Sequence, residues 1–260
     1  MLLAPAGARA DDAALLERHR PVYVLDAQDR HPVAGVRGEP PAPYGRAAPA
    51  KGGGRWLPYW RWHVDNPQDR GILRTGRHEG DWELVQVRVN AGDEPVKAVY
   101  AQHSGAERCG WASVRTRDDA PVAFLANGSH AAYFRPGVRD RTFPDPNDEA
   151  DGRGRIQRPR LVPINARAPA WMRFSGRWGD SRARLPFESS SPRGPAFQGE
   201  SWDDPGAFAA HARPCTDGRC DERGECDTRE LALGGGMAAV LGVLGLLGVW
   251  WRRRAARPVT

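Results

Sequence analysis

Polar and apolar residues alternate over residues 81–84 and again over residues 85–89, and a period of two is typical of a β-strand. In this period the side chains of Asp81 and Glu83 share one face with three valines at positions 85, 87 and 89. Two carboxylates therefore stand at the start of a strand whose same face continues as hydrocarbon. This is the segment around which we expect the chain to be organised.

Other short runs of aromatic, aliphatic and β-branched residues predict further strands, at 22–25, 59–64, 96–103, 111–114, 122–126, 161–164 and 171–174. Polar stretches rich in glycine and proline predict long loops at 31–54 and 135–160. One short helix is expected, at 13–19. Many short strands and almost no helical periodicity predict an all-β protein, an antiparallel β-sandwich with long loops, whose body occupies residues 11–210.

The acidic start of the strand is a candidate cation site. His78 lies three residues before Asp81, and Gly80 between them allows a tight turn that would bring the imidazole over Asp81 and Glu83. Two carboxylates with one imidazole suit magnesium, calcium or manganese better than zinc. The same residues also fit an ordinary solvated strand end with a structural histidine, and their spacing does not decide between the two.

Two later histidines are candidates for the same site, as general acid or base or as part of its rim. One register of the predicted hairpin places Gln102 opposite Glu83, whereas a bulge of one residue would place His103 there. His130 follows a predicted strand in a turn that can present its ring at the end of a sheet. His103, His130 and Trp82 are therefore expected at the rim of a ligand site.

The C-terminal segment predicts a membrane anchor. Residues 231–251 are apolar and uncharged over the roughly twenty residues that a bilayer-spanning helix needs. Arginines follow in a short tail at 252–260, which predicts a single-pass helix in the cell membrane with its C-terminus in the cytoplasm and the body outside. Residues 1–10 are expected to be the remnant of a secretory signal peptide, although a disordered alanine-rich tail fits them equally well.

Charge and cysteines narrow the function further. The formal net charge is +6, but Arg9 and four arginines of the tail supply five of these charges, so the body carries +1 and shows no basic footprint for nucleic acid. A stalk is expected at 211–230. The cysteines lack the Cys-x-x-Cys spacing of zinc sites, so disulfides are expected among Cys109, Cys215, Cys220 and Cys226, in any of three connectivities.

Several blocks of sequence, taken together and in order, resemble the vacuolar protein sorting-associated protein sixty-two family in its bacterial and fungal members. The blocks are Arg20-Pro21-Val22-Tyr23, Tyr59-Trp60, His78-Glu79-Gly80-Asp81-Trp82-Glu83, Tyr100-Ala101-Gln102-His103, Gly128-Ser129-His130-Ala131, Phe174-Ser175-Gly176-Arg177-Trp178-Gly179 and Ser191-Pro192-Arg193-Gly194-Pro195. The resemblance covers about residues 15–208. It implies no settled biochemistry.

The block that begins at His78 is also distantly similar to the metal-binding signature of the necrosis- and ethylene-inducing peptide-like cytolysins. That resemblance implies that His78, Asp81 and Glu83 bind the ion, with Asp69 as the nearest candidate for a fourth ligand. Gly80 stands where the signature has its second histidine. The lytic activity of those toxins is therefore not carried over.

Three hypotheses follow from these observations. The favoured one is a membrane-anchored extracellular domain that binds a divalent cation and recognises a glycan or a lipid head group. The second is a metal-assisted hydrolase of a phosphodiester or glycoside, with His103 or His130 as general acid or base. It is less favoured because the sequence has no nucleophile elbow, phosphate-binding loop, dinucleotide fingerprint or His-Glu-x-x-His helix. The third is a structural surface protein whose polar cluster only joins strands.

Overall fold

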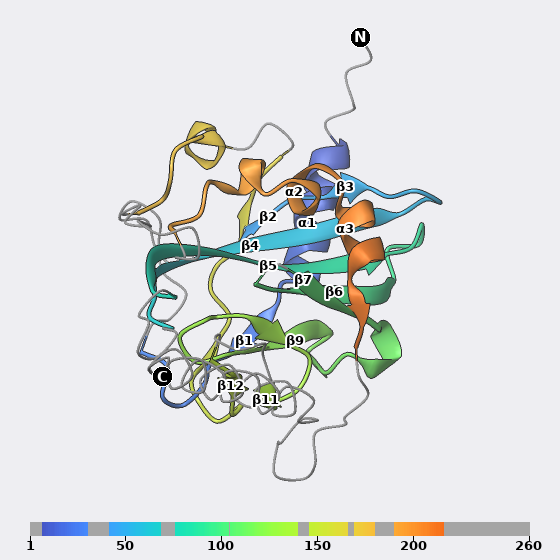
Figure 1. Ribbon diagram of the computed structural model, residues 1–260. Helices are drawn as coiled ribbons and strands as arrows, with labels where there is room; N and C mark the ends of the chain where they lie inside the picture. The colour runs from blue at the N-terminus through green and yellow to red at the C-terminus, as the bar shows by residue number, and fades with distance from the viewer. Residues whose placement is uncertain are drawn as a thin grey trace, which may run out of the picture.

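The computed structural model describes residues 7–30, 42–68, 76–103, 105–139, 146–165, 169–179 and 190–215. Most regular structure in these residues is β-strand, and the helices are few and short (Figure 1). The expected all-β class is therefore confirmed.

The large sheet holds the predicted hairpin at its centre. Its strand order is β14 (Val162–Pro163), β2 (Tyr44–Gly45), β4 (Arg55–Asn66), β5 (His78–Val89), β6 (Pro95–Gln102), β7 (Gly105–Gly110) and β15 (Arg213–Pro214), with β3 (Ala48–Pro49) also paired to β4. β4 and β5 are the longest strands and pair over almost their whole length. They form the platform on which the candidate site is built.

The small sheet lies on one face of the large sheet. Its order is β10 (Ala132–Tyr133), β9 (Ala120–Leu125), β1 (Val22–Val24) and β13 (Ile156–Gln157), with β8 (Thr116–Arg117) also paired to β9; a separate ribbon joins β11 (Gly137–Arg139) to β12 (Asp148–Ala150). Buried Tyr23 and Leu125 of the small sheet share one core with Val85 and Tyr100 of the large sheet. The shared core makes the body a β-sandwich (Figure 1).

The expectation of a purely antiparallel sandwich was wrong in one respect. Three strand pairs are parallel, namely β1 with β9, β2 with β14 and β7 with β15. The members of each pair are far apart in the chain. Alternation along a strand fixes which face is buried, but it carries no information about the direction of a distant partner.

The centre of the large sheet is covered on both faces. Helix α1 (Gly7–Arg18) packs Leu15 and Leu16 against Leu57 and Val87 on the face that also meets the small sheet. The opposite face is covered by the short helices η3 (Ala170–Arg173), η4 (Pro195–Phe197), α2 (Glu200–Asp203) and α3 (Pro205–His211).

Two predicted strands, at 111–114 and 171–174, were wrong. Residues 111–113 form the short helix η2 (Trp111–Ser113), and residues 170–173 form η3.

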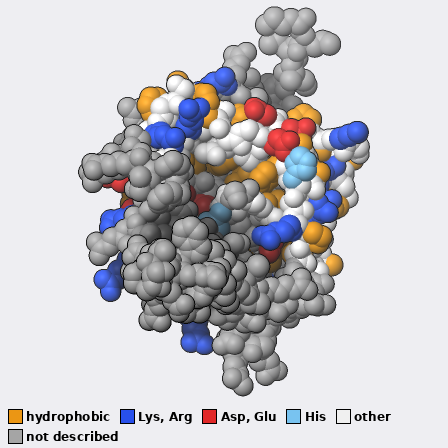
Figure 2. Space-filling model, in the orientation of Figure 1, with side chains coloured by type: hydrophobic (Ala, Val, Ile, Leu, Met, Phe, Trp, Pro, Cys, Tyr) orange, Lys and Arg blue, Asp and Glu red, His pale blue; other side chains and the backbone are white. Residues whose placement is uncertain are grey.

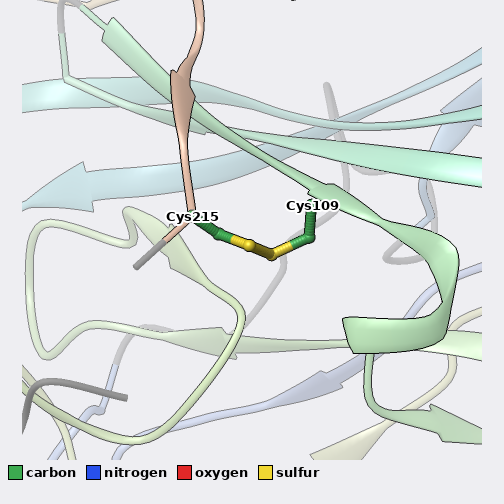
Figure 3. The surroundings of a disulfide bond; sticks show 2 residues. All are labelled: Cys109 and Cys215. Atoms are coloured by element: carbon green, nitrogen blue, oxygen red, sulfur yellow. A yellow bond between two sulfur atoms is a disulfide. The ribbon is translucent and has the colours of Figure 1, made fainter. Parts of the chain in front are cut away.

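A disulfide ties the end of the described chain to the large sheet. Cys109 of β7 is bonded to Cys215, which directly follows β15 (Figure 3). Disulfide formation was expected, and this pair selects one partner for Cys109; Cys220 and Cys226 lie outside the described residues. The folded body therefore extends at least to residue 215, into the segment expected to be a stalk.

The expected membrane-spanning segment at 231–251 and the tail at 252–260 lie outside the described residues. Within the part of the chain that the structure describes, no helix is both long enough and apolar enough to cross a bilayer. Of the expected signal remnant at 1–10, residues 7–10 belong to α1, and the first six residues lie outside the description.

Candidate functional site

The two acids of β5 point into the sandwich. Glu83 lies opposite Arg61 of β4 and Asp81 lies opposite His63, so the four side chains share the face that meets the small sheet. Only 8% of Asp81 and 7% of Glu83 is exposed. The alternation therefore predicted their common face, but they lie in a nearly buried cluster between the sheets.

Arg61 is the cation of this cluster. Its side chain is fully buried, and its Nη2 atom lies 3.7 Å from Oε2 of Glu83. The same atom donates to the carbonyl oxygen of His130, and Nε donates to Nε2 of His63 at 3.1 Å. Because an arginine has only donors, Nε2 of His63 acts as an acceptor, which places the proton of a neutral His63 ring on Nδ1.

His130 enters the cluster from the small sheet. Its ring is fully buried and stacks on His63 with 3.8 Å between ring centroids and 10° between the planes. Nδ1 of His130 lies 3.3 Å from Oδ2 of Asp81, and the same oxygen accepts a 3.1 Å hydrogen bond from Asn66. His130 has a φ of 58°, a backbone conformation that costs a non-glycine residue about 1–3 kcal/mol. The fold therefore holds this ring in place against a local cost.

The cluster has more acids than cations. Burial raises the pKa of Glu83 well above its ordinary value, and the nearby charges of Asp81 and Asp148 raise it further, whereas Arg61 acts in the opposite direction. Asp29 stands behind His130, with 3.9 Å between its Oδ2 atom and Nε2 of the ring. The carboxyl groups of Asp29, Asp81 and Glu83 thus lie in the cluster or against it, and Arg61 is the arginine that pairs with Glu83.

His78 does not join the two acids. Its Nδ1 atom lies 2.8 Å from the carbonyl oxygen of Gly80, which also belongs to β5 and has a φ of 70°. The expected tight turn was wrong, because residues 78–80 are the first residues of β5, and the imidazole contacts the backbone of its own strand. Asp69 lies outside the described residues. Among those that the structure describes, no group of three or more histidine, cysteine, aspartate or glutamate side chains is placed to hold a metal ion.

Trp82 faces away from the two acids. It packs on the other side of β5 against Trp62, Trp171 and Trp178, and only 7% of it is exposed. This aromatic layer reaches solvent near η3, where Phe174 is 53% exposed and Figure 2 shows hydrophobic side chains beside lysine and arginine side chains at the upper left. The structure thus places Trp82 apart from the acid and histidine cluster.

A second polar centre lies around Asp148 of β12. The buried carboxylate accepts hydrogen bonds from His103 Nε2 at 2.6 Å, from Ser129 Oγ at 2.7 Å, from Gln68 Nε2 at 2.9 Å and from the hydroxyl of Tyr133. Burial alone raises the pKa of Asp148, but the hydrogen bond and charge of His103, followed by the other donors, outweigh it and hold the pKa well below its ordinary value. Asp148 is therefore an ionised carboxylate that positions His103.

His103 lies at the partly open side of this centre. The register of β5 and β6 pairs Val85 with Tyr100. Continued by two residues, this register places Gln102 opposite Glu83, so His103 follows β6 in the turn. Its side chain is 27% exposed, its φ is 50°, and its Nδ1 atom has no hydrogen bond to any described residue. Of the two histidines proposed for the rim, His103 is the more accessible.

Sequence reasoning did not identify Arg61, His63, Asn66 or Asp148. Arg61 and His63 come from a strand read as aromatic and buried, whereas Asn66 and Asp148 come from stretches read as loops. The alternation of β4 offered one signal, since it places Arg61 and His63 on a single face. A shallow polar depression of about 370 Å³ adjoins Asp148 and is lined in part by Gln68, Asn127, Asn147 and Glu149.

No protein-family model and no curated protein sequence matches the chain. Among solved structures, a triple mutant of NLPPya has 16% identity over 82% of this chain and 94% of that chain, with a TM-score of 0.44. The chain is similar to necrosis- and ethylene-inducing proteins of a toxin fold. NLPPya in complex with glucosamine has 17% identity over 63% of this chain and 77% of that chain, with a TM-score of 0.38. Necrosis and Ethylene inducing Protein 2, from the causal agent of cocoa's Witches Broom disease, has 16% identity over 57% and 72%, with a TM-score of 0.37.

These neighbours agree with the distant resemblance to necrosis- and ethylene-inducing proteins that the sequence suggested. TM-scores below 0.5 do not establish a shared architecture, so the fold and site described above rest on their own strand order and contacts. The resemblance to the vacuolar protein sorting-associated protein sixty-two family stays a prediction.

Proposed function

We propose that the chain is a membrane-anchored recognition domain of the cell surface, in which Asp81 and Glu83 bind a divalent cation that helps to hold a glycan. The observation that carries the proposal is the surplus of acid in the cluster, where these two carboxyl groups lie on one face with Arg61 as the neighbouring cation. Burial raises the pKa of Glu83, and the charge of Asp81 raises it further, so a positive charge brought by a ligand would favour the ionised form of this carboxyl group.

The described residues supply only part of such a site. Asp81 and Glu83 offer the carboxylate oxygens that magnesium, calcium and manganese prefer. His78 is turned toward Gly80, so we assign the outstanding ligands to Asp69 and to oxygens of the glycan itself. When bound, the ion would supply a positive charge to which sugar hydroxyls can coordinate. The protein's own residues would orient it, because Asn66 and His130 fix the carboxylate of Asp81.

The test is calorimetric titration of the full-length chain in detergent with calcium, magnesium and manganese. The variant Asp81→Asn keeps the shape and the hydrogen-bond acceptor of the carboxylate but removes its charge, so we expect its affinity for the ion to fall at least tenfold. Asp119→Asn removes an exposed acid outside the cluster and should bind as the wild type does. If the wild-type chain binds none of the three ions, the cation proposal fails.

Glucosamine is a suitable first glycan probe, because its ammonium group would complement the acid surplus directly. We expect it to bind more weakly to Asp81→Asn than to Asp119→Asn. Binding of glucosamine without any metal binding would keep glycan recognition and remove the ion from the proposal.

A second candidate function, hydrolysis, is favoured by the pair formed by His103 and Asp148. A buried carboxylate on one ring nitrogen of a partly exposed histidine is the arrangement in which an imidazole can accept a proton from water. Screening phosphodiester and glycoside substrates is the test, with His103→Ala compared with His211→Ala, which removes a histidine that is bonded to Glu200 at the surface. Turnover lost only in His103→Ala would favour the hydrolase. If neither binding nor turnover is found, the structural surface protein remains.

A further inference from the structure

The edge of the small sheet carries a stripe of exposed basic side chains. Arg153, Arg155, Arg158 and Arg160 fall within eight residues on and beside β13, and all four are exposed. Ile156, which lies among them, is 57% exposed. We call these five residues the arginine stripe. These exposed residues belong neither to the acid cluster nor to the Asp148 centre.

The charge of the stripe is largely uncompensated. Arg158 lies 3.9 Å from the exposed carboxylate of Asp118, a separation at which a surface pair contributes little. Arg153, Arg155 and Arg160 form no ion pair with any described residue. The nearby carboxylate of Asp151 already accepts the backbone N–H groups of Ala27 and Arg153. The stripe therefore concentrates positive charge on a body whose formal charge is only +1.

The stripe also lies at a free edge. β13 pairs with β1 on one side, and no other described strand pairs with it. Gln157 lies beside Tyr23, whose side chain is in the core, so Ile156 points to the outer side of the sheet. Charged residues on an edge strand can also have a purely protective role, in which they prevent pairing with other chains. A test of any binding role has to distinguish it from this protective role.

We propose that the arginine stripe docks the body onto a negatively charged bilayer, with Ile156 entering the interface between head groups and acyl chains. The proposal rests on the membrane anchor proposed above. Cys215 packs against the core between the sheets, and β15 runs toward the layer that holds β1 and β9 (Figure 1). Residues 216–230 separate Cys215 from the apolar run, and this length of chain spans at most about 50 Å. An anchor at 231–251 would keep the stripe within reach of the bilayer.

The magnitude of the effect follows from the charge. An arginine close to an anionic bilayer increases binding about fivefold, which corresponds to roughly 1 kcal/mol. Neutralising three arginines should therefore weaken docking on the order of a hundredfold at low salt. Raising the salt concentration to about 0.5 M should have a similar effect, because the Debye length then becomes shorter than the size of the stripe.

The experiment uses the full-length chain in vesicles of phosphatidylcholine, with and without one third phosphatidylglycerol, and measures hydrogen exchange of peptides from 151–160. We expect at least fivefold slower exchange on the anionic vesicles, and we expect high salt to abolish the difference. The variant Arg155→Gln/Arg158→Gln/Arg160→Gln should also show no difference in exchange between the two vesicle types. The control Lys51→Gln/Lys97→Gln/Arg173→Gln removes three exposed cations elsewhere and should keep the difference.

Retention on the vesicles after a carbonate wash reports the anchor separately. If the chain is retained but peptides from 151–160 exchange equally fast on both vesicle types, the docking proposal is wrong and the anchor proposal stands. The arginines would then serve only to protect the edge of the sheet. Lipid-dependent protection without retention would keep docking and remove the anchor. Protection that persists in the triple glutamine variant or at high salt would also overturn the proposal.

Discussion

At the scale of single residues, His19 couples the stability of the body to pH. The side chain lies at the end of α1, is fully buried and meets the ring of Trp111 edge-on. Burial lowers its pKa, the charge of Arg18 lowers it further, and the acidic groups nearby only partly offset this. The unfolded chain takes up a proton near pH 6.5, whereas the folded chain takes it up only at lower pH. Stability is therefore complete above this value and is lost as the pH falls through it.

The measurement is urea unfolding at pH 7.5 and at pH 5. We expect His19→Phe to lose less stability between these two values than the wild type does, because the variant has no group to protonate at this position. His211→Gln removes a largely exposed histidine and should follow the wild type. A pH dependence that is identical in His19→Phe and the wild type would contradict this explanation.

The sequence pattern predicted only part of the arrangement of the cluster residues. The period of two placed Asp81 and Glu83 on one face, because that relation depends on the strand alone. Their partners Arg61 and His130 come from another strand and from the second sheet, so only the tertiary structure brings them together. His78 was expected over the acids, but the left-handed backbone at Gly80 turns it away.

At the scale of elements, Gly80 fits β5 against the aromatic layer. A Cβ atom at this position would lie 2.1 Å from the carbonyl oxygen of Trp178 and 2.3 Å from the ring of Trp62, and its φ of 70° is itself unfavourable for other residues. We expect Gly80→Ala to reduce the free energy of unfolding by about 2–5 kcal/mol, as measured by urea denaturation.

Gly52→Ala is the matched control for Gly80. Gly52 has a φ of 82°, but nothing lies within 4 Å of the position where its Cβ would stand. This variant reports the backbone cost alone, which is about 1–2 kcal/mol. Equal losses in the two variants would show that the fit against Trp62 and Trp178 contributes nothing.

Elements were predictable where a long alternation or a hairpin defined them, as for β5 and β6. Residues 111–114 and 171–174 were mistaken for strands, because runs of four residues are too short for a period to separate a strand from a 3₁₀ turn. The covering of the large sheet by α2 and α3 was not foreseen either. It depends on pairs such as Trp60 with Trp202, which lie far apart in the chain.

At the scale of the whole molecule, the disulfide between Cys109 and Cys215 closes a loop with a sequence separation of 106 residues. A loop of about this length is expected to stabilise the folded state by roughly 4–5 kcal/mol, through the entropy that it removes from the unfolded chain. The double variant Cys109→Ser/Cys215→Ser should therefore lose several kcal/mol in urea denaturation. Cys220→Ser/Cys226→Ser should leave the stability of the body unchanged, and an equal loss in both variants would refute the assignment of the effect to this bond.

The position of this bond has a mechanical consequence. The described residues that cover the outer face of the large sheet precede Cys215, and the chain beyond Cys215 leads toward the apolar segment in the sequence. Tension applied through the tail reaches a covalent cross-link to β7 before it reaches α2 and α3. As long as the disulfide stays oxidised, a pulling force would therefore act on the β-sandwich through β7, and α2 and α3 would stay packed on the sheet.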